Sequence, residues 1–318
     1  MRSSLTGILF YDDGMTDQRQ KVGLALGGGG ARGWAHLGVL LAMEEAGVTY
    51  DAIAGTSMGA LVGGFAAARK LDGLREISEE LDLKRVISLF AETTLPRSGI
   101  VNGKKIMNLA REYLGTPDIR DLPIPFCAVA TDIQTGEEVV LSSGDLVEAI
   151  RASIAIPGIF TPVKRDGHYL ADGGLVSPLP VDAVREMGVD RVIGVDLHGT
   201  WPQRPTPMQE KAISMRTRMK SQNLPDWWNQ FWRQLETKAD QWINGWSREA
   251  DGPNLFTVLG NTIDIVSAQR TRTILASRQP DLLIQPQVGN IGHMEFHRAD
   301  EAIEAGYQAG KVAFSTGA

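Results

Sequence analysis

The feature that most constrains the fold is a unit that occurs twice near the start of the chain. An apolar run, "KVGLAL" (21–26), leads through "GGGGARG" into the helical run "AHLGVLLAMEEAG" (35–47). A second apolar run, "YDAIAG" (50–55), leads through "TSMG" into a helical run over 58–70. Short apolar runs bounded by glycine are typical of buried strands, and Gly47 stands where a helix C-terminal cap is expected. Two successive strand–turn–helix units predict an α/β fold with parallel strands.

The same alternation continues toward the C-terminus with one interruption. We predict further strands over 125–133, 137–143, 168–174, 190–197 and 281–287. We predict further helices over 145–153, 178–188, 261–279 and 299–314, and two or three before Leu114, the last of them capped by Asn102. The pattern predicts a three-layer α/β/α fold with a mostly parallel central sheet. It covers residues 21–318 as one domain, after an N-terminal tail over 1–20.

The interruption covers residues 199–257, which we interpret as an insertion in that domain. It holds six of the seven tryptophans, beside the basic residues Lys211, Arg216, Arg218 and Lys220. Apolar residues between Trp227 and Trp246 recur near helical spacing. A Trp-bearing amphipathic helix beside basic residues suits docking on an anionic bilayer, here through 211–246. The same stripe also suits packing on this domain, as a lid or otherwise, or on a second subunit in a homodimer, and the sequence favours none of these.

Composition excludes several other classes of protein. A formal charge of −6 argues against nucleic acid as a general partner, since phosphate binding rests on a basic surface. A single cysteine, Cys127, excludes an intrachain disulfide and a cysteine-rich zinc site. The start lacks a secretory apolar region, and no uncharged stretch reaches the ~20 residues of a membrane span. We therefore expect a cytoplasmic protein that can lie peripherally on the inner membrane face.

The glycine loop between the first strand and the first helix suits an anion, because its amides meet no Cβ and face a helix N-terminus. Three interpretations compete: an oxyanion hole, a dinucleotide site and a tight turn without a ligand. Gly28, Gly30 and Gly33 fit G-x-G-x-x-G, but Asp51 lies at the start of the second strand rather than its end, where a ribose-binding acid belongs. No Walker lysine follows the glycines. Arg32 is expected either to hold the loop or to meet an anionic head group.

Ser57 lies between Gly55 and Gly59 in a G-x-S-x-G motif, which is typical of a serine nucleophile. Such a serine attacks an ester only when a positioned base takes its proton. An α/β-hydrolase triad would pair an acid with His198 or His293, but that fold reaches its nucleophile after more strands than the two predicted here. A carboxylate can also serve as the base when burial raises its pKa.

Asp172 is the candidate for such a carboxylate base. It ends an apolar run and precedes Gly173 and Gly174, which allow sharp curvature; an Asx turn is the alternative for this pattern. The pair His293 and His297 has the spacing of metal ligands, yet no third ligand is evident, so we predict no metal site.

Together the three motifs resemble those of the patatin-like phospholipases. "GGGGARG" is similar to the family's G-x-G-x-x-G loop, "GTSMG" to its G-x-S-x-G elbow and "DGG" to its D-G-A/G motif, in the family's order. "RASIAIPGIFTPV" (151–163) also resembles the segment ahead of the family's aspartate. The bacterial single-domain relatives of neuropathy target esterase are the most similar members, and the Trp-rich insertion has no counterpart that we recognise.

The resemblance implies a Ser57–Asp172 dyad without histidine, with Ser57 as nucleophile and Asp172 as its base. It implies oxyanion donors in the amides of Gly28, Gly29 and Gly30, with Arg32 and Gly33 supporting the loop or the head group. It also implies hydrolysis of phospholipid, lysophospholipid or other lipid esters with no metal or organic cofactor. The alternatives are a lipid-binding or regulatory protein with idle catalytic residues and, more remotely, a nucleotide-binding protein.

Overall fold

The computed structural model describes residues 19–90, 101–199 and 255–315. The chain divides into two compact units, residues 1–201 with 262–318, and residues 202–261. The first unit carries the sheet and the candidate site. Nearly all of the predicted tail, most of the insertion over 199–257, and the basic and Trp-bearing segment 211–246 lie outside the described residues. Their interpretations therefore stay predictions.

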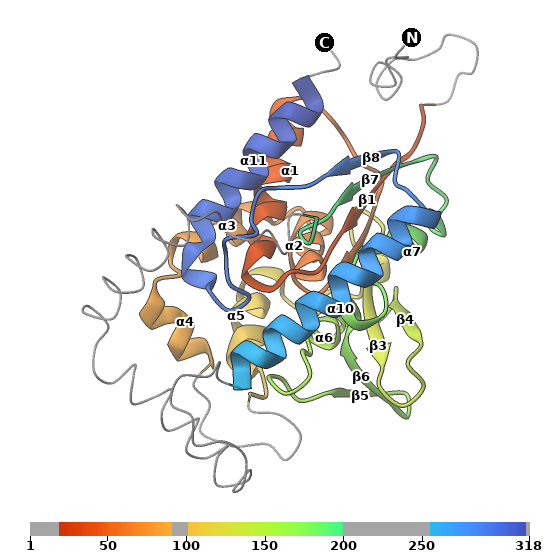
Figure 1. Ribbon diagram of the computed structural model, residues 1–318. Helices are drawn as coiled ribbons and strands as arrows, with labels where there is room; N and C mark the ends of the chain where they lie inside the picture. Colours follow the sequence, from red (N-terminus) through yellow and green to blue (C-terminus); the bar gives the residue numbers. More distant parts are fainter. Residues whose placement is uncertain (1–18, 91–100, 200–254, 316–318) are drawn as a thin grey trace, which may run out of the picture. The chain divides into compact units, whose positions relative to one another are not determined.

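One eight-stranded sheet forms the centre of the first unit (Figure 1). Five strands are parallel, in the order β3-β2-β1-β7-β8, as the sequence predicts for an α/β fold. These are β1 (Val22–Leu26), β2 (Ala52–Thr56), β3 (Phe126–Asp132), β7 (Arg191–Val195) and β8 (Leu282–Ile284). The antiparallel strands are β4 (Glu138–Leu141), β5 (Val163–Arg165) and β6 (His168–Asp172). Strand β5 was not predicted from the sequence.

Strand β3 brings the ends of β2 and β6 together. Thr56, the last residue of β2, pairs with Val129, and Asp172, the last residue of β6, pairs with Ala130. β2 runs parallel to β3 and β6 runs antiparallel to it, while β4 occupies the other edge of β3 at these positions. The two strands therefore lie end to end along one edge of β3, and their carboxyl ends meet. This arrangement places the residue after Thr56 beside Asp172.

Helices cover both faces of the sheet, as the predicted three-layer fold requires (Figure 1). Alternate residues of β1 point to opposite faces, so Leu24 and Leu26 pack in the larger core while Ala25 packs in the smaller one. The larger core contains residues of α1, α2 and α11, and the smaller core contains residues of α7 and α10. The helices are α1 (Ala35–Glu45), α2 (Met58–Ala67), α3 (Leu71–Glu79), α4 (Leu83–Phe90), α5 (Lys104–Leu114), α6 (Leu146–Ser153), α7 (Val181–Arg185), α10 (Leu255–Ser277) and α11 (Ala299–Ser315).

Helix α10 starts at Leu255, inside the range predicted for the insertion and six residues before the predicted helix start at 261. It is also the longest helix in the described part of the chain, with 23 residues. None of the described helices combines the length and the apolar character that crossing a bilayer requires.

Candidate active site

Ser57 lies on a strained turn between β2 and α2. Its φ is 55° and its ψ is −123°, in a region that non-glycine residues rarely adopt, and it is 4% exposed. The flanking glycines make the turn possible. A Cβ on Gly55 would lie 2.4 Å from the carbonyl oxygen of Gly59, and a Cβ on Gly59 would lie 2.1 Å from that of Leu26. The G-x-S-x-G spacing is therefore required by backbone contacts on both sides of the serine.

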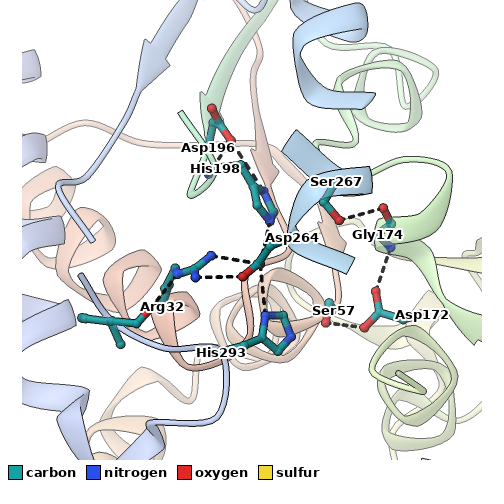
Figure 2. Close-up of polar contacts among 10 residues, drawn as sticks. Arg32, Ser57, Asp172, Gly174, Asp196, His198, Asp264, Ser267 and His293 are labelled. Atoms are coloured by element: carbon teal, nitrogen blue, oxygen red, sulfur yellow. Dashed lines mark hydrogen bonds and ion pairs between the residues drawn. The ribbon is translucent and has the colours of Figure 1, made fainter. Parts of the chain in front are cut away.

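Asp172 is in hydrogen-bond contact with Ser57, although 115 residues separate them in the chain. The Oγ–H of Ser57 donates to Oδ2 of Asp172 at 2.6 Å, and the Gly174 amide donates to Oδ1 at 2.7 Å (Figure 2). Burial raises the pKa of Asp172 above the ordinary aspartate value, while these hydrogen bonds act in the opposite direction. A buried carboxylate with a raised pKa and a short contact to a serine hydroxyl is suited to accept its proton.

Backbone contacts from α6 and β3 fix this pair. The amide of Ser57 donates to Oγ of Ser153 at 2.8 Å, and that hydroxyl donates to the carbonyl of Val129 at 2.5 Å. The amide of Asp172 donates to the carbonyl of Ala155 at 2.9 Å. Ser153 and Ala155 both lie in the segment 151–163, which resembles the segment ahead of the aspartate in the patatin-like phospholipases. Its role here is to hold the backbone of both residues.

The glycine loop lies next to Ser57, and its amides differ in their partners. A Cβ on Gly28 would lie 3.4 Å from Cβ of Ser57. The Gly28 amide itself donates to the carbonyl of Pro178 at 2.9 Å. Within the described residues the amides of Gly29 and Gly30 have no acceptor, and Gly30 has a φ of 56°. The expectation of three donors is therefore corrected for Gly28, whose N–H is used by the protein itself, and narrows to Gly29 and Gly30.

Arg32 is buried at 2% exposure and does not face solvent. Its two terminal nitrogens donate to the carboxylate of Asp264 at 3.0 and 2.9 Å, and its Nε donates to the carbonyl of Ile291 at 2.8 Å. This is the geometry of a loop support rather than of a head-group contact. Gly33 allows close packing on the nucleophile turn, because a Cβ there would lie 2.2 Å from Cβ of Met58.

One face of α10 contacts both loops of the site. Asp264 binds the glycine loop through Arg32, and Ser267, one turn later, donates to the carbonyl of Gly174 at 3.0 Å (Figure 2). Residues at i and i+3 share a helix face, which explains how one helix reaches both loops. Neither Asp264 nor Ser267 was predicted as a site residue. The sequence carries no local signal for them, because 232 residues separate Arg32 from Asp264.

Two of the chain's histidines lie near Asp264. Nδ1 of His293 is 3.3 Å from Oδ1 of Asp264, and Nε2 of His198 is 3.8 Å from the same atom. Burial lowers the pKa of His198 to about 4, against the opposing charges of Asp196 and Asp264. The Ser57 hydroxyl donates its hydrogen bond to Asp172 and to neither imidazole. A triad of Ser57 and Asp172 with either histidine is therefore not formed.

An apolar cavity opens from the Ser57 side of the site, with a volume of about 830 Å³ including its open mouth. Apart from Ser57 and Gly30, all its lining side chains are apolar or aromatic, and most come from α2, α3, α4 and α5. The lining residues are Gly30, Trp34, Ser57, Met58, Leu61, Phe65, Leu74, Ile77, Leu81, Val86, Leu89, Phe90, Ile106, Leu109, Ala110, Ile154, Ile156, Phe160, Met294 and Phe296. A cavity with so apolar a lining is typical of a site for an apolar ligand.

The residues of the dinucleotide interpretation are separated in the structure. Asp51 precedes β2 at the N-terminal end of the strand, where it accepts a hydrogen bond from the Val22 amide and pairs with Arg19. The glycine loop follows the C-terminal end of β1, the strand parallel to β2. Asp51 is therefore not placed to meet a ribose bound at the loop. Within residues 19–90, 101–199 and 255–315, no group of three or more His, Cys, Asp or Glu side chains is arranged to hold a metal ion.

Comparison with known proteins gives four findings. The family model for the patatin-like phospholipases matches residues 24–185, a range that contains Ser57 and Asp172 and ends before Asp264. An uncharacterized NTE family protein of Mycobacterium tuberculosis is 35% identical, over 90% of this chain and 89% of that protein. The human patatin-like phospholipase domain-containing protein 6 is 30% identical, over 92% of this chain but 20% of that protein. The crystal structure of VipD from Legionella pneumophila superposes with a TM-score of 0.48 at 16% identity, covering 94% of this chain and 67% of that one.

Proposed function

The chain belongs to the patatin-like phospholipase family, which indicates a lipid hydrolase, and from that premise we propose a serine esterase that cleaves acyl esters of phospholipids or lysophospholipids. The observation that carries the proposal is the 2.6 Å hydrogen bond from Ser57, which lines an apolar cavity, to Asp172. The cavity suits an acyl chain, because each buried methylene contributes about 0.8 kcal/mol to binding. We expect the ester carbonyl of that chain to lie next to Ser57.

The proposed reaction has two steps. Oγ of Ser57 attacks the ester carbonyl while Asp172 accepts the hydroxyl proton, and that proton passes to the departing alcohol as the C–O bond breaks. Water then cleaves the acyl-enzyme and releases the fatty acid. The amides of Gly29 and Gly30 hold the oxyanion formed in both steps, and each such donor lowers a barrier by about 3 kcal/mol in comparable sites. The other function considered for this fold is lipid binding with idle catalytic residues.

The experiment that tests the proposal is labelling of the full chain by a fluorophosphonate probe, together with hydrolysis of a lysophospholipid. Wild type is expected to label on Ser57 and to hydrolyse the ester. Ser57→Ala removes the nucleophile and should abolish both. Asp172→Asn removes the base, and we expect hydrolysis to fall by about 100-fold to 10,000-fold, the usual contribution of a general base.

Two variants control for the effect of substitution itself. Ser142→Ala and Asp166→Asn make the same chemical changes at exposed positions, and both should keep wild-type activity. Labelling that persists in Ser57→Ala would rule out this nucleophile. A wild-type protein that binds lysophospholipid but neither labels nor hydrolyses it would be the idle lipid-binding protein instead.

A further inference from the structure

The pair formed by His293 and Asp264 lies beside the dyad and takes no part in it. Asp264 is 1% exposed and its carboxylate is bound by both terminal nitrogens of Arg32. Burial alone would raise the pKa of Asp264, but contacts with His293 and Arg32 outweigh it and lower the pKa to about 2. The carboxylate is therefore ionised and can only accept hydrogen bonds. It follows that Nδ1 of His293, at 3.3 Å, carries the ring hydrogen.

The other ring nitrogen of His293 has no partner within the described residues, although it is buried. The side chain as a whole is 9% exposed. In the neutral ring with hydrogen on Nδ1, Nε2 holds a lone pair. A buried acceptor left without a hydrogen bond destabilises the fold, so such a group calls for a ligand or a function.

The unpartnered nitrogen is on the side of the reacting groups. Figure 2 shows one ring nitrogen directed to Asp264 and the other on the side of Ser57. The ring lies against the glycine loop, because a Cβ on Gly30 would be 2.7 Å from its Cδ2. The ring therefore borders the space between the loop amides and the dyad.

The backbone around His293 holds the ring in this place. Its carbonyl accepts the amide hydrogen of Ala31 at 2.8 Å, and the neighbouring Ile291 carbonyl accepts Nε of Arg32. The next residue, Met294, lines the apolar cavity. Ring position is thus tied to the same loop that supplies the proposed oxyanion donors.

We propose that His293 is a further catalytic residue, whose Nε2 lone pair takes a proton from the water that cleaves the acyl-enzyme. The proposal rests on the proposed function and assigns a role within its second step. The water O–H bond breaks as its oxygen bonds to the acyl carbonyl, and the proton passes to Nε2. The bond from the acyl carbon to Oγ of Ser57 then breaks, and the proton on the imidazolium returns to Oγ. Asp264 stays ionised throughout and orients the ring.

The second buried histidine of this region does not compete for the role. Nδ1 of His198 is 3.9 Å from Asp196 and its Nε2 is 3.8 Å from Asp264, so both nitrogens face carboxylates. The side chain is 3% exposed. Of the two histidines beside Asp264, His293 is the one with a ring nitrogen left without a partner in the described part of the chain.

The test separates the two steps of turnover with a p-nitrophenyl ester of a medium-chain fatty acid and the full-length chain. Release of p-nitrophenolate in the first turnover reports acylation of Ser57, and the later steady rate reports cleavage of the acyl-enzyme. In His293→Gln we expect the first-turnover release to persist and the steady rate to fall by about 100-fold or more, as for other general bases. Mass spectrometry should then find the acyl group on Ser57. Hydroxylamine, a stronger nucleophile than water, should speed turnover of the variant.

A matched control is His168→Gln. His168 also pairs through Nδ1 with an aspartate, Asp132 at 2.6 Å, but it is exposed. Its substitution should leave both phases at wild-type values. Fluorophosphonate labelling of Ser57 at the wild-type rate would show that the site in His293→Gln is intact.

The proposal is wrong if the steady rate is unchanged in His293→Gln, or if acylation and the steady rate are reduced alike. If neither His293→Gln nor His293→Asn labels with fluorophosphonate, the ring serves to hold the loop and the proposal is also wrong. Failure of the proposed function gives a different result, since wild type itself would then form no acyl-Ser57.

Discussion

At the scale of single residues, the site depends on where a side chain is absent as much as on where one is present. Ser57 can adopt its positive φ only because the turn is closed by glycines that touch backbone on both sides. The contacts of Gly59 are with the end of β1, so this glycine also sets the distance between α2 and the glycine loop. The glycines of the motif are thus required by the packing of the turn, and the same turn sets the position of Ser57.

Gly59→Ala and Gly63→Ala are expected to differ in stability, although both add one methyl group to α2. A Cβ on Gly59 would lie 2.1 Å from the Leu26 carbonyl oxygen, which is backbone and cannot move alone. A Cβ on Gly63 first meets a side-chain methyl of Ile53 at 3.0 Å. We expect Gly59→Ala to lose at least the about 1–3 kcal/mol typical of overpacking. In Gly63→Ala the contact is offset by the about 1 kcal/mol that alanine gains over glycine in a helix.

Urea unfolding of the two variants beside wild type measures this difference. Fluorophosphonate labelling of the same samples reports whether the elbow survives. Equal losses of unfolding free energy in both variants would contradict the backbone contact as the cause.

The sequence predicts single site residues where the chemistry is encoded locally. Ser57 and Asp172 stand in motifs whose glycines are adjacent in the chain. His293 and Asp264 stand in no such pattern, and they acquire a role only because α10 and the 288–296 loop lie over the glycine loop. The Gly28 amide was assigned wrongly for a similar reason, since its acceptor at Pro178 is 150 positions away in the chain.

At the scale of elements, the helices α2 to α5 supply the cavity and a single face of α10 supports the loops. The alternation of strand and helix predicted the elements of the core well, because buried strands and amphipathic helices have distinct periods. It did not predict β5, a three-residue strand with little apolar character, or the antiparallel direction of β6. Direction depends on which partner a strand meets, and that is not a local property of its residues.

Filling the cavity from α5 should change which acyl chains are accepted. Ala110 lines the cavity and is 3% exposed, so Ala110→Phe places a ring where part of a chain would lie. Displacing about two methylenes would cost about 1.6 kcal/mol, or roughly 10-fold in kcat/KM for long-chain esters, while short-chain esters would be little affected. The ratio of kcat/KM for p-nitrophenyl palmitate to that for p-nitrophenyl butyrate measures the change.

Asn108→Phe adds the same ring to the exposed side of α5 and serves as the control. Its ratio should match that of wild type. If Ala110→Phe also keeps the wild-type ratio, the acyl chain does not occupy this cavity.

At the scale of the whole molecule, stability should depend on pH through histidines that the fold buries in neutral form. Burial lowers the pKa of His36 to about 4, against the hydrogen bond to the Gly27 carbonyl, and lowers the pKa of His198 to about 4 as well. The unfolded chain binds these protons near pH 6.5, whereas the folded chain does not until about pH 4. The free energy of unfolding is therefore fully retained above about pH 6.5 and decreases as pH falls toward 4.

Each of the two histidines should contribute a slope of up to about 1.4 kcal/mol per pH unit within that window. Urea unfolding between pH 7 and pH 5 measures the slope. In His198→Gln the slope should be smaller by the contribution of one histidine. His168→Gln removes an exposed histidine and controls for the substitution. A slope unchanged in His198→Gln would contradict neutral burial of this side chain.

Domain organisation was predictable to the extent that composition changes along the chain. The clustered tryptophans and prolines show that the alternation of strands and helices is interrupted from residue 199 onward. The helix that follows begins at Leu255, six residues before the predicted start at 261, and Asn254, a residue type that favours N-caps, directly precedes it in the sequence. Proposals for membrane or subunit contact through 211–246 rest on that composition alone.

Because β2 and β6 meet end to end on β3, the reactivity of Ser57 depends on both strands having their native register. A slip of β6 along β3 by one residue would turn Asp172 to the opposite face, and a slip of two would move it about 7 Å, beyond hydrogen-bond reach of Ser57. A compact chain with misregistered strands would keep its secondary structure and lose its reactive serine. The rate at which fluorophosphonate reactivity appears during refolding would therefore measure how fast these two strands reach their native register.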